Sequence, residues 1–223
     1  MRAEAMIPAY NEAGTIARVV RGVAPHVDRV LVVDDGSTDG TGEAARHAGA
    51  DVIRHERNLG KGRAVRSGLA AILVSPATHV VVLDGDLQHV PDEVPRLLDM
   101  ARRSGADLVI GGRRFDKTAM PTSRYYANVA GSRVLSWFVG LPLRDTQSGF
   151  RVYRCEALRQ IRLEASGFEI ETEMLVKLAR RRARIVEVPV SAVYGAERSK
   201  LRPMRDTTKT CFLAVYYRFL ERM

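Results

Sequence analysis

The sequence predicts a single α/β domain built on a mostly parallel β-sheet with helices on both of its faces. Its first half alternates short apolar runs with amphipathic stretches, which is the pattern of successive β–α–β units. Several apolar runs are almost continuous in valine, isoleucine and leucine, as expected for parallel strands that are buried on both faces. The length of 223 residues also suits one domain of this class.

The elements of the first half follow from this alternation. Runs rich in β-branched residues predict strands, and stretches with apolar residues at helical spacing predict helices. The predicted strands are residues 3–7, 29–34, 51–54, 78–84 and 107–111. The predicted helices between them are residues 15–23, 41–47, 61–73 and 92–103.

The second half is less regular, and no repeat or linker divides it from the first. The expected elements are a loop leading into a helix over residues 120–139, a glycine-containing turn and strand within 145–154, a helix over 169–182, a strand over 185–190 and a terminal amphipathic helix over 206–222. We therefore treat residues 1–223 as one domain.

The charge balance favours anionic partners. The formal net charge is +9, and arginine supplies most of the excess. Because guanidinium groups suit phosphate oxygens, this composition fits a diphosphate, a nucleic acid or an anionic membrane surface. Cys155 and Cys211 are too few for a disulfide framework, and no stretch approaches the ~20 apolar residues that span a bilayer. We expect a cytoplasmic protein that is soluble or contacts a membrane face.

An acidic loop, Asp84-Gly85-Asp86, directly follows a run of valine and leucine. Ligands of open α/β sheets bind beyond the carboxyl ends of the strands, where this loop should lie. Two neighbouring carboxylates repel each other unless a cation joins them, and Mg2+ or Mn2+ would do so. Gln88 and His89 follow within reach of the same ion. Alone, however, the tripeptide is more typical of a solvated turn.

Two further motifs end predicted strands or begin helices. Carboxylates of Asp34 and Asp35 could accept hydrogen bonds from a nucleobase or ribose, or the segment could be a turn that caps the next helix. Backbone N–H groups around Gly60 and Gly62, with Lys61 between them, favour an anion at a helix start. The alternative is a helix entry with a solvated lysine, and the spacing is not that of a P-loop.

Basic and polar residues cluster near the two later turns. Arg113 and Arg124 lie close to glycines and tyrosines and could bind a diphosphate, or form a solvated basic loop. The polar stretch from Asp145 to Arg151 could line an acceptor site or only lead into a strand. The sequence has no Gly-x-Ser-x-Gly elbow, which leaves hydrolase chemistry with little support.

The order of these motifs is more specific than any one of them. The series is Pro8-Ala9-Tyr10-Asn11-Glu12, Asp34-Asp35-Gly36-Ser37-Thr38-Asp39-Gly40-Thr41, Asn58-x-Gly60-Lys61-Gly62, Asp84-Gly85-Asp86-Leu87-Gln88-His89 and Ser148-Gly149-Phe150-Arg151. Over essentially the whole chain it resembles family 2 of the glycosyltransferases, with the Rossmann-like GT-A fold. Within that family it looks most like the dolichyl-phosphate mannose and bacterial polyprenyl-phosphate hexose synthases.

The resemblance implies a role for each matching residue. The nucleoside would be held by Pro8, Tyr10, Glu12 and Asp35, with Lys61 and Gly85 beside the donor. The divalent metal, Mg2+ or Mn2+, would be bound by Asp84, Asp86 and Gln88. Arg113 and Arg124 would contact the diphosphate or the acceptor phosphate, and Ser199 and Lys200 would close over the site. The middle residue of the acidic loop, often alanine in these synthases, is Gly85 here.

The implied reaction is an inverting transfer of a hexose, with mannose from GDP-mannose favoured over glucose from UDP-glucose. A polyprenyl phosphate acceptor is already ionised at neutral pH and needs no general base. If the acceptor were a hydroxyl of a soluble molecule or a glycan, Asp145 could serve as that base. Asp86, Arg113 and Arg124 would act directly at the reacting groups in either case.

Two further alternatives and the terminal helix concern binding partners. A nucleic-acid-binding protein would use the arginine surplus, but few patterns of basic and aromatic residues support it. A catalytically inactive sugar-nucleotide-binding subunit is disfavoured because both carboxylates of the acidic loop are present. An apolar face formed by Phe212, Val215, Tyr216 and Phe219, near several basic residues, would suit an anionic membrane surface or a docked helix.

Overall fold

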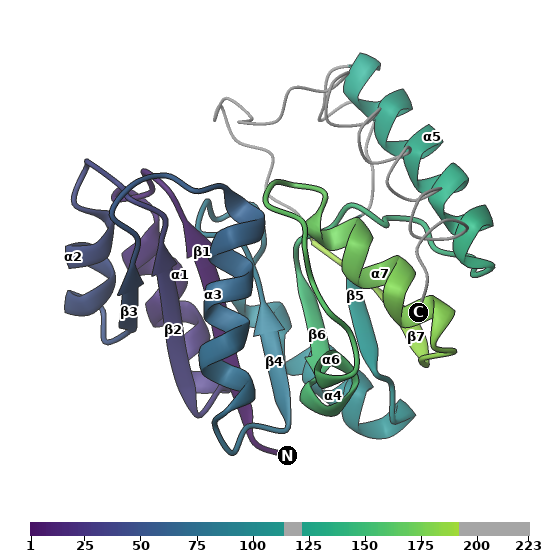
Figure 1. Cartoon of the computed structure of the whole chain (residues 1–223), viewed down its shortest axis with the longest axis horizontal. Coiled ribbons are helices and arrows are strands. Elements are labelled where there is room, and N and C mark those ends of the chain that lie inside the picture. The colour runs from purple at the N-terminus through teal and green to yellow at the C-terminus, as the bar shows by residue number, and fades with distance from the viewer. Residues whose placement is uncertain (114–121, 192–223) are drawn as a thin grey trace.

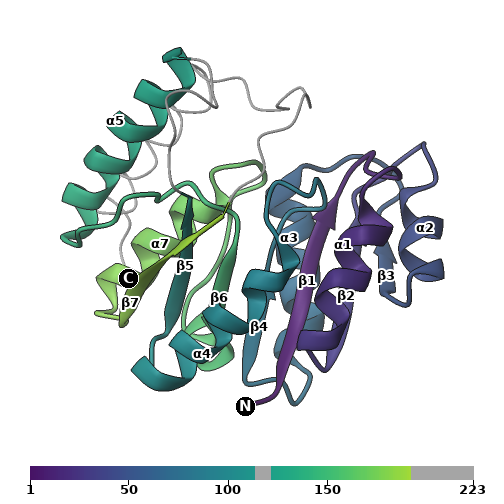
Figure 2. The ribbon, with the colours of Figure 1, turned by 180° about the vertical axis from the view of Figure 1, so that it is seen from behind.

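The computed structural model describes residues 1–113 and 122–191 of the chain. Within these ranges one twisted sheet is covered by helices on both faces (Figures 1 and 2). The predicted α/β class with a mostly parallel sheet is therefore confirmed. Ser199, Lys200 and the predicted helix over residues 206–222 lie outside the described residues.

The sheet has seven strands in the spatial order β3-β2-β1-β4-β6-β5-β7. Every neighbouring pair is parallel except the two pairs that β6 makes with β4 and β5. The strands are β1 (Ala3–Ala9), β2 (Arg29–Asp34), β3 (Asp51–Arg54), β4 (His79–Val82), β5 (Leu108–Arg113), β6 (Arg151–Arg154) and β7 (Ile185–Val190).

The helices form two layers and one outlying element. Helices α3, α6 and α7 cover one face of the sheet, whereas α1, α2 and α4 cover the other (Figures 1 and 2). Helix α5 lies beyond the ends of β5 and β7 and contacts α7 (Figure 1). The helices are α1 (Ile16–Val23), α2 (Thr41–His47), α3 (Lys61–Leu73), α4 (Val94–Ser104), α5 (Thr122–Val139), α6 (Cys155–Arg159) and α7 (Ile170–Arg180), with short 3-10 turns η1 (Ala24–His26) and η2 (Pro91–Glu93).

The core consists of two apolar layers separated by the sheet. Alternate residues of a strand point to opposite faces, so Met6 of β1 packs beneath α3 while Ile7 packs against the α1 side. Both side chains are fully buried. Burial of the central strands on both faces explains why their sequences are nearly continuous in apolar residues.

The structure adds two features to the elements expected from the sequence. The strand predicted within residues 145–154 is present as β6, but it runs antiparallel to its neighbours, and the short helix α6 was not predicted. Because β6 is antiparallel, its amino-terminal end lies at the edge where the parallel strands finish. The turn before Arg151 is thereby brought to the predicted ligand edge.

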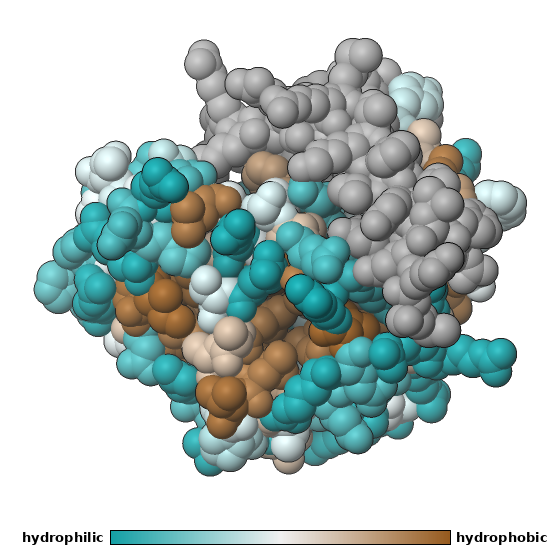
Figure 3. Space-filling view, in the orientation of Figure 1, coloured by the Kyte–Doolittle hydropathy of each residue, from teal (hydrophilic) through white to brown (hydrophobic). Residues whose placement is uncertain are grey.

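Among the described residues, no helix is both long and apolar enough to cross a bilayer. Figure 3 shows the face covered by α3, where polar residues surround hydrophobic areas near that helix. Val74, at the end of α3, is 87% exposed.

Candidate active site

Five segments meet at one edge of the sheet. They follow the carboxyl ends of β1, β2, β4 and β5 and precede the amino-terminal end of β6. Hydrogen bonds between side chains and the backbone join three of them: the Thr15 hydroxyl donates to the Gly85 carbonyl at 2.7 Å, and Asn11 N donates to the Ser37 hydroxyl at 2.9 Å. The structure thus gathers the motifs that are far apart in the sequence.

Asp84 and Asp86 follow β4 and are in different electrostatic environments. Burial acts to raise the pKa of Asp84, but the neighbouring charges, with the Lys61 ammonium foremost, together hold that pKa below its usual range. Burial and the negative charge of Asp84 together raise the pKa of Asp86 to about 6. Near neutral pH the pair therefore holds two negative charges that repel each other.

Lys61 begins α3 and joins two carboxylates. Its Nζ lies 2.6 Å from Asp84 Oδ1 and 2.6 Å from Glu171 Oε1 of α7. Burial acts to lower the pKa of Lys61, yet these two carboxylates raise it above its usual range. The ring of Phe168 lies 5.7 Å from the same ammonium. Lys61 is therefore a permanent positive charge against the acidic loop.

The acidic loop fits a divalent cation that is also bound by a diphosphate. Mg2+ in nucleotide sites is usually held by one or two carboxylates together with substrate phosphates. Asp84 and Asp86 would supply such a pair, and a bound cation would remove their mutual repulsion. Gln88 lies beside them and donates its backbone N–H to Asp86 Oδ1 at 3.0 Å. In the described part of the chain, no three histidine, cysteine or acidic residues form a metal-binding group.

His89, which was expected near the same ion, is packed into the interior. It is 3% exposed, and its ring lies 5.3 Å from that of Phe150. Burial lowers the pKa of His89 to about 4, so the imidazole is neutral at pH 7. Its Nδ1 has no hydrogen-bond partner among the described residues.

The close approach of Asp84 and Lys61 explains why the Ser148-Gly149-Phe150 turn contains a glycine. A Cβ atom at this position would lie 2.6 Å from Asp84 Oδ2 and 3.3 Å from Lys61 Nζ. Only a residue without a side chain lets the backbone approach these charges so closely. The turn is therefore part of the wall around Asp84.

Gly60 and Gly62 have a packing role in the structure. A Cβ on Gly60 would lie 2.4 Å from the Ser166 carbonyl oxygen, and Gly62 N donates to the same oxygen at 3.0 Å. Gly60 also has a φ of +97°, which favours glycine. The two glycines hold the loop before α7 against the start of α3, which brings Glu171 to Lys61.

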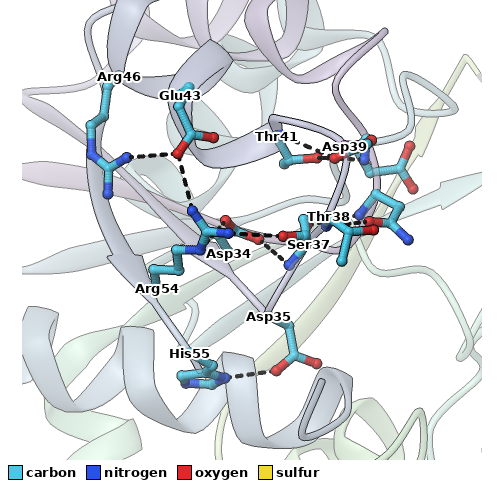
Figure 4. Close-up of polar contacts among 12 residues, drawn as sticks. Asp34, Asp35, Ser37, Thr38, Asp39, Thr41, Glu43, Arg46, Arg54 and His55 are labelled. Atoms are coloured by element: carbon cyan, nitrogen blue, oxygen red, sulfur yellow. Dashed lines mark hydrogen bonds and ion pairs between the residues drawn. The ribbon is translucent and has the colours of Figure 1, made fainter. Parts of the chain in front are cut away.

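Asp35 organises the segment that leads into α3. Its Oδ1 lies 2.7 Å from His55 Nδ1 and accepts from Leu59 N at 2.9 Å, while Oδ2 accepts from Gly60 N at 2.8 Å. Figure 4 shows the His55 ring directed at this carboxylate. His55 Nε2 in turn lies 3.0 Å from the Ser67 hydroxyl. Asp35 is 3% exposed, so its expected contact with a nucleoside stays a prediction.

The neighbouring Asp34 is fully buried and holds the loop after β2 together. Its Oδ1 accepts from Ser37 N at 2.9 Å, and its Oδ2 lies 3.6 Å from Arg54 Nε. Arg54 also donates to the Ser37 carbonyl and to Glu43, as Figure 4 shows. The turn of the alternative interpretation is therefore present, but the residue at the cap position of α2 is Gly40, whose lack of a side chain leaves no side-chain cap.

The remaining residues expected at the nucleoside follow or end β1. Pro8 is buried in the strand opposite Val33 of β2. Tyr10 is 36% exposed just beyond the strand. Glu12 N donates to the Thr41 hydroxyl at 2.8 Å, which fixes the loop against α2. The structure thus places Tyr10 at the ligand edge, where an aromatic ring could stack on a base.

Arg113 and Asp145 form a second buried ion pair at this edge. Asp145 Oδ2 accepts from Arg113 Nε at 2.6 Å and from its backbone N at 3.1 Å, and Oδ1 accepts from Nη2 at 3.1 Å. Asp145 is fully buried and Arg113 is 12% exposed. A carboxylate held in this way is poorly placed to act as a base, because a base must reach the substrate proton. Instead, the two hydrogen bonds that Asp145 accepts from Nε and Nη2 fix the orientation of the Arg113 guanidinium.

Two acidic residues at the site were not predicted from the sequence. Glu171 of α7 binds Lys61, and Glu187 of β7 accepts hydrogen bonds from the backbone of Arg144 and Asp145. Both lie on elements that were expected, but nothing in the local sequence links them to partners so far away. Arg124 belongs to α5, while Ser199 and Lys200 lie outside the described residues.

Known proteins are similar to this chain in sequence and in fold. The family model described as Glycosyl transferase family 2 matches residues 5–162. An undecaprenyl-phosphate mannosyltransferase of Micrococcus luteus is 38% identical over 207 residues, which are 86% of this chain and 84% of the relative. A polyprenol monophosphomannose synthase of Mycolicibacterium smegmatis is 33% identical, with coverages of 83% and 75%.

A solved structure agrees in fold. Glucosyl-3-phosphoglycerate synthase of Mycobacterium tuberculosis, in complex with Mn2+ and UDP-glucose, superposes with a TM-score of 0.79. It is 26% identical in sequence, and the match covers 97% of this chain and 78% of that one. The ordered motifs, their meeting at one edge of the sheet and these similarities agree. The chain belongs to glycosyl transferase family 2 and is a glycosyltransferase with the GT-A fold.

Proposed function

We propose that the protein transfers a hexose from a nucleotide-diphosphate sugar to a polyprenyl phosphate, and that GDP-mannose is its preferred donor. The main observation in support is the sheet edge where the acidic pair Asp84 and Asp86 lies beside the cations Lys61 and Arg113. Such an edge suits a metal-bound diphosphate and a second phosphate at once. The relatives from Micrococcus and Mycolicibacterium are named for polyprenyl-phosphate mannose transfer.

The side chains divide the work of the transfer. A divalent cation held by Asp84, Asp86 and Gln88 would neutralise charge that develops on the leaving nucleoside diphosphate. Lys61 keeps a fixed positive charge beside Asp84. Arg113, oriented by Asp145, presents a planar fork to phosphate oxygens, and Arg124 is expected to do the same.

A phosphate acceptor agrees with the state of Asp145. A lipid phosphate oxygen is already ionised at neutral pH, so it attacks the anomeric carbon without losing a proton to the protein. Attack from the face opposite the leaving group inverts the configuration of the sugar. Asp145, bound to Arg113 in the interior, is then a positioning group and not a base.

A lipid acceptor also implies contact with the cytoplasmic face of a membrane. The formal net charge of +9 favours attraction to anionic lipid headgroups. The contact would be peripheral, at the surface of the bilayer.

A UDP-glucose donor is the alternative that a specific observation favours. The structural neighbour from Mycobacterium tuberculosis holds UDP-glucose with Mn2+, and its name gives a soluble acceptor, 3-phosphoglycerate. Glucosyl transfer to polyprenyl phosphate, or transfer to a soluble acceptor, therefore has to be tested beside the mannosyl reaction.

The deciding experiment measures label in the lipid phase. Purified protein is incubated with radiolabelled GDP-mannose or UDP-glucose, Mn2+ or Mg2+, and polyprenyl phosphate, and the mixture is extracted with organic solvent. We expect label from GDP-mannose in the extract, and none after the metal is removed with EDTA. Asp84→Asn should also abolish the product.

Three other outcomes would favour the alternatives. More product from UDP-glucose would assign the donor as UDP-glucose. Label that enters only a soluble acceptor such as 3-phosphoglycerate would replace the lipid by a soluble molecule. Absence of lipid product with both donors would refute the acceptor assignment.

A further inference from the structure

Glu187 lies in β7, the last strand of the sheet, which is separated by β6 and β5 from the strand that leads into the acidic loop. Its carboxylate is nevertheless directed to the corner of the site formed by the Arg144–Asp145 backbone. Oε2 accepts from Arg144 N at 2.6 Å, and Oε1 accepts from Asp145 N at 3.1 Å. A carboxylate is an acceptor on both oxygens, so it can satisfy two backbone N–H groups together. A glutamine would turn an NH2 group toward one of them.

The neighbouring strand leaves room for this side chain. Gly112 of β5 lies beside the Glu187 carboxylate, and a Cβ atom at Gly112 would be 2.0 Å from Oε1. Gly112 has no positive φ that would call for glycine. The close approach of the carboxylate is therefore the physical reason for a glycine at this position.

The corner that Glu187 fixes continues into Arg113. Asp145 is fully buried, and both of its oxygens bind the Arg113 guanidinium, with a shortest distance of 2.6 Å. Any movement of the Asp145 backbone would shift that carboxylate and rotate the planar guanidinium with it. The three residues form one continuous chain of hydrogen bonds from β7 to the end of β5.

We propose that Glu187 is a positioning residue of the transfer reaction, because it fixes the Arg144–Asp145 backbone and thereby aims the Arg113 guanidinium at phosphate. The inference rests on the proposed function, in which Arg113 contacts a phosphate of the donor or acceptor. Glu187 itself touches neither reactant.

A matched carboxylate allows this role to be separated from simple stabilisation. Asp107 precedes β5 and accepts a hydrogen bond from Arg184 N, before β7, at 2.8 Å. Its hydrogen bond links the starts of β5 and β7, at the ends of these strands away from Arg113. Asp107→Asn should disturb the strand pair without altering Arg113.

The first test is a double-mutant cycle on kcat/KM for label transfer. Glu187→Gln should lower kcat/KM about tenfold when Arg113 is present, but less than about twofold in the Arg113→Gln background, because residues that act through one another are not additive. Asp107→Asn should leave kcat/KM unchanged within about twofold. Equal losses from Glu187→Gln in both backgrounds would overturn the proposal. If Glu187→Gln does not fold, Glu187→Asp, which withdraws the carboxylate by one methylene, replaces it in the same cycle.

The second test requires no reaction. Exchange of the Arg113 Nε–H with water, followed by NMR, should be about tenfold faster in Glu187→Gln than in the natural protein and unchanged in Asp107→Asn. Unchanged exchange in Glu187→Gln would overturn the positioning role even if the natural protein makes lipid product. Faster exchange in a protein that makes no lipid product would uphold the positioning role and refute the proposed acceptor.

Discussion

At the residue scale, the two carboxylates of the acidic loop differ in how readily they ionise. The Asp84 carboxylate lies 2.6 Å from Lys61 Nζ. By contrast, burial and the negative charge of Asp84 raise the pKa of Asp86 to about 6. In the proposed metal site, a carboxylate must lose its proton before it can bind the cation. Metal binding should therefore depend on pH mainly through Asp86.

We expect the affinity for Mn2+ in the presence of a nucleoside diphosphate to fall about tenfold per pH unit below pH 6, because protons then compete with the metal for Asp86. Above that pH, Asp86 is already ionised and the affinity should level off. Calorimetric titrations at pH 5, 6 and 7 measure the effect. Asp86→Asn is the control, since the phosphates also titrate near pH 6, and its profile should be shallower. Identical profiles would show that Asp86 is not the titrating ligand.

Gly85 is the position at which the loop departs from the alanine common in the synthases it resembles. A Cβ atom there would lie 3.3 Å from Ile16 Cδ1 and 3.5 Å from Ala9 Cβ, contacts that a small side-chain shift relieves. We expect Gly85→Ala to keep transfer activity within about twofold and to change the free energy of unfolding by less than about 1 kcal/mol. Activity assays and thermal unfolding measure both quantities.

Gly149 provides the contrasting variant. A Cβ atom there would lie 2.6 Å from Asp84 Oδ2, so Gly149→Ala must displace either the turn or the carboxylate. It should lose most of the metal-dependent activity. If Gly85→Ala proved as damaging as Gly149→Ala, the space measured around Gly85 would not describe the working site.

The roles of individual residues were only partly predictable from the sequence. The place of Asp84 and Asp86 at the sheet edge was predictable because they follow an apolar strand, which is a local pattern, and their role as metal ligands stays a prediction. Asp145 appeared as a polar residue near a turn, and only the fold shows that it binds Arg113, 32 positions away. Partners this distant leave no periodic signal in the sequence, and the same is true of Glu171 and Glu187.

At the scale of elements, Lys61 connects three parts of the fold. It lies at the start of α3, and its ammonium bridges the loop after β4 and the first turn of α7 through Asp84 and Glu171. The side chains of Lys61 and Glu171 are 14% and 12% exposed. Removing the cation would leave two carboxylates in a poorly solvated site.

We expect Lys61→Ala to lower the free energy of unfolding of the metal-free protein by about 2–3 kcal/mol, since breaking a buried ion pair leaves an uncompensated charge. Added Mn2+ should restore more stability to this variant than to the natural protein, because a cation at Asp84 replaces part of the lost charge. Thermal unfolding with and without Mn2+ tests both effects. The double variant Lys61→Met with Glu171→Gln, which removes the cation and one of the two carboxylates, should be less destabilised than Lys61→Ala. If Lys61→Ala were as stable as the natural protein, the bridge would have no role in stability.

Most elements were predictable, but the direction of one strand was not. The bounds of β2, β3, α2 and α3 agree with the ranges expected from apolar periodicity. The composition of β6 is the same whether the strand is parallel or antiparallel, so nothing in Arg151–Arg154 announces its direction. That direction places the Ser148–Phe150 turn at the active edge. Helix α6, at five residues, is too short to produce a helical period.

At the scale of the whole molecule, the site is assembled from both halves of the chain. The family model covers residues 5–162, which supply the acidic loop, Lys61, Arg113 and Asp145. Helix α7 and strand β7 follow that range and supply Glu171 and Glu187, which orient Lys61 and the Asp145 corner. The last elements of the described chain thus support side chains contributed by the first.

The net charge of +9 makes a prediction about the molecule as a whole. If the acceptor is a lipid phosphate, the protein should bind vesicles that contain an anionic lipid such as phosphatidylglycerol and ignore vesicles of phosphatidylcholine alone. Because attraction between exposed charges is screened over about 8 Å at physiological ionic strength, binding should weaken steadily as salt is added. Co-sedimentation at increasing NaCl measures this dependence. Equal binding to neutral vesicles, or binding that ignores salt, would mean that the basic surplus does not guide the protein to its lipid substrate.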